Sequence, residues 1–69
     1  MVEVYKTNVQ ESNHAMGLVS VLSQKFPLFK INFDIDDPDR ILRVEGEHIS
    51  SETIEVLMKE NGFWCEALP

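Results

Sequence analysis

The chain has 69 residues, of which 43% are hydrophobic and 26% are charged. Twelve acidic residues against six basic ones give a formal net charge of −6 at pH 7. A chain of this length forms one small domain, residues 1–69, and it is too apolar for an intrinsically disordered protein. An acidic surface repels phosphate, so we expect no nucleic-acid partner and no membrane partner.

The cysteine content and the apolar runs bear on the cellular compartment. Cys65 is the only cysteine, so no internal disulfide can form, whereas small secreted domains usually carry an even cysteine framework. A strand pattern begins at Val2, which leaves no room for a signal peptide, and no apolar run approaches the roughly 20 residues of a membrane span. We therefore expect a soluble, cytoplasmic protein.

The first part of the chain predicts a strand, a loop and a helix. Residues Val2–Lys6 alternate apolar and polar side chains, which indicates a strand. The polar stretch Thr7–Asn13 predicts a loop, and either Ser12 or Asn13 is suited to cap the helix that follows. Apolar residues then recur at steps of three and four until Pro27 ends the helix. This apolar stripe consists of Ala15, Leu18, Val19, Leu22 and Phe26.

A β-hairpin is predicted next. Residues Leu28–Asp36 alternate more strictly than any other stretch and predict a strand with one dry and one wet face. The turn Asp36–Asp39 joins it to a strand over Arg40–Glu45, in which Leu42 and Val44 face inward. The dry face of the first of these strands consists of Phe29, Ile31, Phe33 and Ile35.

The last part of the chain predicts a second helix and a short strand. Ser50 is suited to cap the helix, and Ile49 and Ile54 have the spacing of a hydrophobic staple around that cap. The pair Asn61–Gly62 provides the left-handed residue that commonly ends a helix. Residues Phe63–Leu68 then form the final strand.

The predicted order is β-α-β-β-α-β. Right-handed crossovers place the first and third strands in the centre of one antiparallel sheet, with both helices on one face. The sequence therefore predicts an α+β domain, a ferredoxin-like βαββαβ sandwich whose four-stranded sheet leaves its other face open to water.

Three stretches carry a resemblance to a known family: the step Pro27–Phe29, the strand Ile41–Gly46 and the helix ending Glu60–Phe63. With this order and length, the chain resembles the heavy-metal-associated domains of copper chaperones and metal-pumping ATPases over nearly its whole length. That family binds metal through a Met-x-Cys-x-x-Cys loop, whose two thiolates suit Cu(I). Here Glu11 and His14 stand at the two cysteine positions. The resemblance therefore implies a copper chaperone-like fold without the thiolate motif.

A protein-interaction module is the first functional hypothesis. Strand alternation places Tyr5, Ile41 and Trp64 outward, where they would form one apolar patch across neighbouring strands of the open face. Exposed apolar patches can mark protein interfaces, and Trp and Tyr are frequent in binding hot spots. The alternative is that these side chains only pack against their cross-strand neighbours. The loop before the first helix, together with the first turn of that helix, is the second surface suited to carry a contact.

An altered metal site is the second functional hypothesis. His14 and Glu11 offer an imidazole and a carboxylate, which together suit a divalent transition metal such as zinc, and Cys65 begins near the same loop. Structural zinc usually has four ligands, so we expect no firm cofactor and only weak binding. The alternative is that Glu11 and His14 are solvated residues at a helix N-terminus.

Signatures of catalysis are missing from the chain. Three glycines do not make a phosphate-binding loop, and Cys65 has no evident base beside it. The acidic residues between Asp34 and Asp39 lack the glycine and the closing glutamate of a calcium-binding loop. We therefore expect a domain that is not an enzyme, with a protein partner and an oligomeric state that the sequence leaves open.

Overall fold

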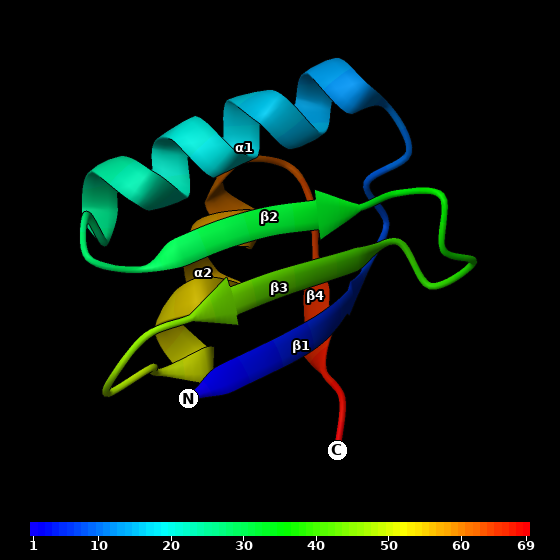
Figure 1. The fold of residues 1–69 in the computed structure, drawn as a ribbon. Helices are drawn as coiled ribbons and strands as arrows, with labels where there is room; N and C mark the ends of the chain where they lie inside the picture. The colour runs from blue at the N-terminus through cyan, green and yellow to red at the C-terminus, as the bar shows by residue number, and fades with distance from the viewer.

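The computed structural model describes all 69 residues and contains six elements in the predicted order (Figure 1). They are β1 (Val2–Thr7), α1 (Ser12–Lys25), β2 (Lys30–Asp34), β3 (Ile41–Glu45), α2 (Ser51–Glu60) and β4 (Cys65–Ala67).

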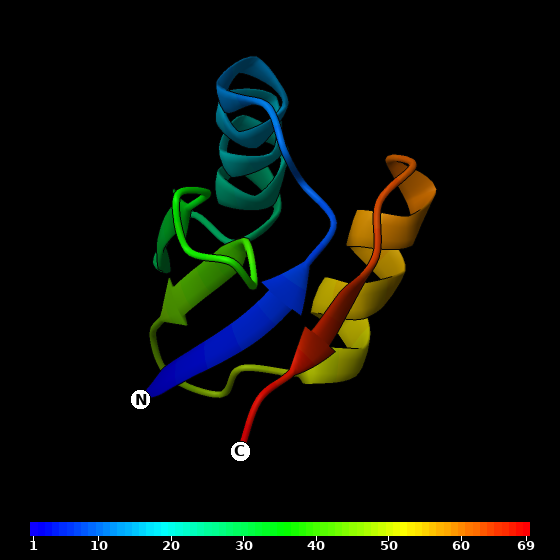
Figure 2. The same ribbon diagram turned by 90° about the vertical axis from the view of Figure 1, so that its right-hand side faces the viewer.

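The four strands form one sheet in the order β2-β3-β1-β4, and every neighbouring pair is antiparallel. Strands β1 and β3 are central, as predicted. Figures 1 and 2 show both helices on the same side of the sheet, with α1 alongside β2 and α2 alongside β4. This arrangement confirms the predicted α+β fold of ferredoxin-like topology. Neither helix is long and apolar enough to cross a membrane.

The hydrophobic core lies between the sheet and the two helices. Leu42 and Val44 of β3 are fully buried there, which confirms their predicted inward orientation. The dry face of β2 packs against the same cluster as partly buried side chains, also as predicted. The ten buried residues of the cluster are Tyr5, Val9, Ala15, Leu18, Leu22, Leu42, Val44, Ile54, Met58 and Cys65.

The prediction that Tyr5 faces outward is wrong. Tyr5 lies opposite Leu42 in the β1–β3 ladder, and its side chain is fully buried in the core. Its hydroxyl group is 3.0 Å from the Oγ atom of Ser51 at the start of α2, so the polar end of the ring has a hydrogen-bond partner. Val2 and Val4, which alternate with Tyr5, therefore face the open side of the sheet, and Val2 is about half exposed there. A tyrosine buries well when its hydroxyl group is satisfied in this way.

The two helices begin differently. The Ser50 side chain accepts a hydrogen bond from the backbone N–H of Thr53 at 3.3 Å, which confirms the predicted cap of α2. Helix α1 begins at Ser12, so Glu11 is its N-cap residue, and neither Ser12 nor Asn13 occupies the capping position. The Glu11 side chain makes no capping hydrogen bond. The prediction of a side-chain cap on α1 is therefore wrong. The N-terminus of α1 stays open to solvent.

Other predicted boundaries differ by one or two residues. Strand β2 covers Lys30–Asp34 and β4 covers Cys65–Ala67, so both are shorter than the alternating patterns that predicted them. Strand β3 begins at Ile41 because Arg40 has a positive φ of 51°, which takes it out of the extended region. Gly62 has a φ of 89°, as expected for the residue that ends α2.

Gly46 lies at the open end of the β2–β3 hairpin, directly after β3. The Phe29 ring lies so close to Gly46 that a Cβ atom at this position would overlap the ring. Glycine is thus required here for close packing, and the contact holds the chain that enters β2 against the end of β3.

Candidate functional site

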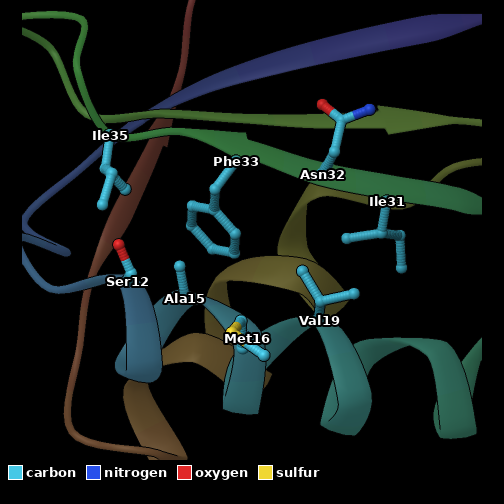
Figure 3. Close-up of a pocket in the computed structure, with 8 residues that line it drawn as sticks. All are labelled: Ser12, Ala15, Met16, Val19, Ile31, Asn32, Phe33 and Ile35. Atoms are coloured by element: carbon cyan, nitrogen blue, oxygen red, sulfur yellow. The ribbon is translucent and has the colours of Figure 1, made fainter.

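An apolar groove runs between the first half of α1 and strand β2 (Figure 3). Its volume is about 500 Å³, and six of the eight residues that line it are hydrophobic. A groove of this size and lining is large enough to hold apolar side chains. The lining residues are Ser12, Ala15, Met16, Val19, Ile31, Asn32, Phe33 and Ile35.

Strand alternation and helix geometry create this groove. Figure 3 shows Ile31 and Phe33 pointing from β2 toward α1, while Asn32 between them points away. Helix α1 contributes Met16 and Val19 from a face beside its buried stripe. The side chain of Met16 is 72% exposed although it is apolar. A flexible thioether at the mouth of a groove can adapt to the shape of a bound side chain.

The groove lies beside an unpaired sheet edge. Strand β2 ends the strand order, so one side of its backbone has no neighbouring strand. On the face away from the groove, β2 presents Lys30, Asn32 and Asp34, all exposed. Neither Lys30 nor Asp34 takes part in a salt bridge, since the two ion pairs of the structure join other residues. An extended chain could pair with this edge and place alternate side chains over the groove.

The predicted patch of Tyr5, Ile41 and Trp64 does not form. Tyr5 is in the core, and Ile41 is only 8% exposed. Ile41 alternates with the inward-facing Leu42 and lies opposite Asp34 of β2, so it is on the open face, but it is buried there and offers little apolar surface. Trp64 alone remains exposed, at 45%, and its backbone N–H donates to Asn8 Oδ1 at 3.0 Å.

The loop between β1 and α1 is held in place by Thr7. The Thr7 hydroxyl group donates to the carbonyl oxygen of Arg40 and accepts from the backbone N–H of Val9 at 3.1 Å. The backbone N–H of Thr7 donates to the carbonyl oxygen of Asp39 at 3.1 Å. Val9 is fully buried. This loop is therefore tied both to the β2–β3 turn and to the core, which fixes the direction in which α1 leaves it.

Glu11 and His14 lie next to each other at the start of α1. His14 Nδ1 is 3.8 Å from Glu11 Oε2, and both side chains are about half exposed or more. The imidazole ring of His14 also packs against the Phe63 ring, with 5.4 Å between centroids. The pair offers one nitrogen and one carboxylate ligand to a cation, which is half the number that structural zinc usually has.

Cys65 does not join this pair. No group of three or more His, Cys, Asp or Glu side chains in the structure could hold a metal ion. Burial, together with a smaller contribution from the nearby Glu55 carboxylate, raises the pKa of the Cys65 thiol to about 12. Cys65 is thus a protonated thiol at neutral pH and packs as a small hydrophobic side chain in the core.

Sequence reasoning did not find the groove. The alternation of β2 correctly indicates a dry face, but it does not show how much of that face α1 leaves uncovered. A usable signal was present in Met16 and Val19, which lie beside the buried stripe of α1 and widen its apolar face. Comparisons with protein-family models, curated proteins and solved structures found no match to this chain. Inference about function therefore depends on the groove and on the sheet edge beside it.

Proposed function

We propose that this domain is a non-catalytic protein-binding module that uses the groove between α1 and β2. The supporting observation is the position of an apolar groove of about 500 Å³ along the unpaired edge of β2. A partner strand that pairs with β2 gains backbone hydrogen bonds from the edge and side-chain contacts from the groove. The groove overlaps the second surface that the sequence suggested, the loop before α1 with the first turn of α1, because Ser12 and Ala15 line it.

The resemblance to heavy-metal-associated domains fits a function other than thiolate metal binding. Glu11 and His14 occupy the positions of the two family cysteines, so we do not propose the thiolate copper chemistry of that family for this chain. A copper chaperone-like fold that has lost its thiolates keeps its surfaces, and we propose that binding of a protein is the function that remains.

Selection of binding peptides tests the proposal. A library of displayed random peptides is selected on the immobilised domain, and the chosen peptides are titrated into isotope-labelled protein. We expect chemical shift changes confined to Ser12–Val19 and Ile31–Ile35. The Met16→Glu variant, which puts a charge at the mouth of the groove, should bind at least about tenfold more weakly.

Val56→Glu is the matched control. Val56 is an apolar residue on the surface of α2, 56% exposed and outside the groove, so its replacement tests the same chemical change elsewhere. Peptides should bind this variant and the unchanged protein equally. Selected peptides that shift residues outside the groove, or that bind Met16→Glu unchanged, would contradict the proposal.

A weak site for a divalent transition metal is the second candidate. It is favoured by the 3.8 Å contact between His14 Nδ1 and Glu11 Oε2 at the exposed start of α1. Titration with Zn²⁺ should then give saturable shifts over residues 10–16, and His14→Ala should abolish them. His48→Ala is the control, because His48 is also exposed but lies in the loop before α2. Shifts that survive in His14→Ala, or none at all, would remove this candidate.

A further inference from the structure

We propose that a second copy of this chain is a partner for this surface, through antiparallel pairing of β2 with β2 of the second copy. This inference rests on the proposed function, since it names one occupant of the same edge and groove. It follows from three features of β2: its unpaired edge, its charge pattern and its apolar row.

The charges of β2 are self-complementary in an antiparallel arrangement. When two copies pair about a two-fold axis at Asn32, Lys30 of each copy lies opposite Asp34 of the other. Opposite charges that face each other across strands stabilise the pairing, whereas like charges destabilise it. The pairing forms two such contacts because the interface is symmetric. Both side chains are exposed and without an ion-pair partner within their own chain.

Parallel pairing in the same register is disfavoured by the same charges. It would place Lys30 opposite Lys30 and Asp34 opposite Asp34. Charged residues on an edge strand also discourage pairing with unrelated strands. The row formed by Lys30, Asn32 and Asp34 therefore disfavours pairing with most strands. It favours a strand whose charges run in the opposite order, with an acidic residue opposite Lys30 and a basic residue opposite Asp34. The chain itself supplies that order when it runs antiparallel.

The apolar row of β2 is also satisfied by this pairing. In the same register, Ile31 of each copy lies opposite Phe33 of the other, on the face toward α1. These side chains are only partly buried in the single chain. The added strand would cover them and bring apolar groups to Met16 and Val19, which line the groove. Burial of this surface gives the association a hydrophobic component beside the charge pairs.

Association should be weak and depend on concentration. Strand β2 has only five residues, and each copy carries a net charge of −6, which opposes close approach. We therefore expect dimers to form in the micromolar range or above. Sedimentation equilibrium from about 1 μM to about 1 mM covers this range of dissociation constants.

Charge reversal tests the proposed register. Lys30→Asp and Asp34→Lys each replace both attractive contacts with repulsive ones, so each variant should dimerise at least about tenfold more weakly than the unchanged chain. The double variant Lys30→Asp/Asp34→Lys restores the pairing in the reverse sense and should dimerise as the unchanged chain does. Lys30 lies opposite Glu45 of β3 within its own chain, so Lys30→Asp could also affect the fold. The double variant carries the same replacement of Lys30 and therefore controls for this effect.

Mixing the two single variants provides the sharpest measurement. Lys30→Asp presents two acidic residues and Asp34→Lys presents two basic ones, so an equimolar mixture should form a heterodimer at concentrations where each variant alone is mainly monomeric. Circular dichroism confirms that each variant is folded. Amide hydrogen exchange of β2 should slow as the concentration of the unchanged chain rises, while that of β4 stays constant.

Two results would overturn the inference: a chain that stays monomeric to about 1 mM, or a dimer whose affinity does not respond to the charge reversals. Peptide selection on the groove remains a separate measurement in both cases. If selected peptides still bind in a manner sensitive to Met16→Glu, only self-pairing is rejected. If they do not bind, the proposed function is rejected as well.

Discussion

The two edges of the sheet differ in what they offer to another chain. Strand β2 has five residues, and an apolar groove lies between it and α1. Strand β4 has three residues, and its first residue, Cys65, is buried. It pairs with β1 along one side and contacts helix α2, and Glu66 and Ala67 remain exposed. Both strands end the same sheet, but only β2 combines an unpaired backbone with room for side chains.

This difference shows two ways of protecting an edge strand. A very short strand offers too few hydrogen-bonding groups to recruit a partner, which is the situation at β4. Strand β2 is longer, and its protection consists of charges at Lys30 and Asp34. Charges permit selective pairing, whereas shortness limits the number of hydrogen bonds that any added strand can form. The functional surface is therefore expected at β2, and four predictions test how far the two edges are independent.

The largest effect is expected for Leu42→Ala. Leu42 is fully buried on β3, where it lies opposite both Phe33 of β2 and Tyr5 of β1. Removing it should lower the free energy of unfolding by about 2–5 kcal/mol. Denaturant unfolding monitored by Trp64 fluorescence and by circular dichroism should give coincident transitions, because both edges depend on the same core. Leu28→Ala, at a position 92% exposed, is the control and should change stability by less than about 0.5 kcal/mol.

Thr7→Val should have the next largest effect. The substitution keeps the size of the side chain but leaves the Val9 N–H and the Arg40 carbonyl group without the bonds to Thr7 Oγ1. Unsatisfied buried groups cost about 1–3 kcal/mol each, and denaturant unfolding measures the loss. Thr7 is opposite Cys65 of β4 and is tied to the turn after β2, so both edges should lose protection from amide exchange. A loss confined to one edge would show that the edges open separately.

Alkaline pH should weaken the β4 side through Cys65. The folded-state pKa of about 12 lies above the ordinary value of 9.0, so the unfolded chain loses its proton first as the pH rises. The contribution of Cys65 is complete below pH 9 and is lost as the pH rises toward 12, with roughly 1 kcal/mol lost at pH 10. Denaturant unfolding at pH 7 and pH 10 measures this loss. Cys65→Ala should show a smaller decrease between the same two values, and an equal decrease would assign the effect to other groups.

The smallest effect is expected for Tyr5→Phe. This variant keeps the buried ring and removes only the hydroxyl group, which is 3.0 Å from Ser51 Oγ. We expect a loss of about 0.5–1.5 kcal/mol in the free energy of unfolding. The double variant with Ser51→Ala should lose less than the sum of the two single variants, because both remove the same bond. Strictly additive losses would mean that the two hydroxyl groups do not interact in solution.

Local signals in the sequence were sufficient to predict most of the fold. The strict alternation of Leu28–Asp36 identified β2 and its dry face, and Ser50 and Gly62 correctly marked the two ends of α2. These features depend on residues close together in the chain, where a capping side chain or a left-handed residue acts on its own backbone. The first helix was located by the same reasoning, but its expected cap was wrong because several polar residues there suit that role equally well.

Tertiary structure alone decided which face of β1 is buried and where the groove lies. Alternation with period two states that Val2 and Val4 share a face opposite Tyr5, but not which of the two faces meets the core. The pairing of Tyr5 with Leu42 and the position of Ser51 on α2 settle that choice, and they join residues far apart in the chain. The groove likewise depends on how α1 packs beside the edge of β2. The sequence thus determined the elements and their order, while long-range packing decided which apolar side chains are covered and which remain free to bind.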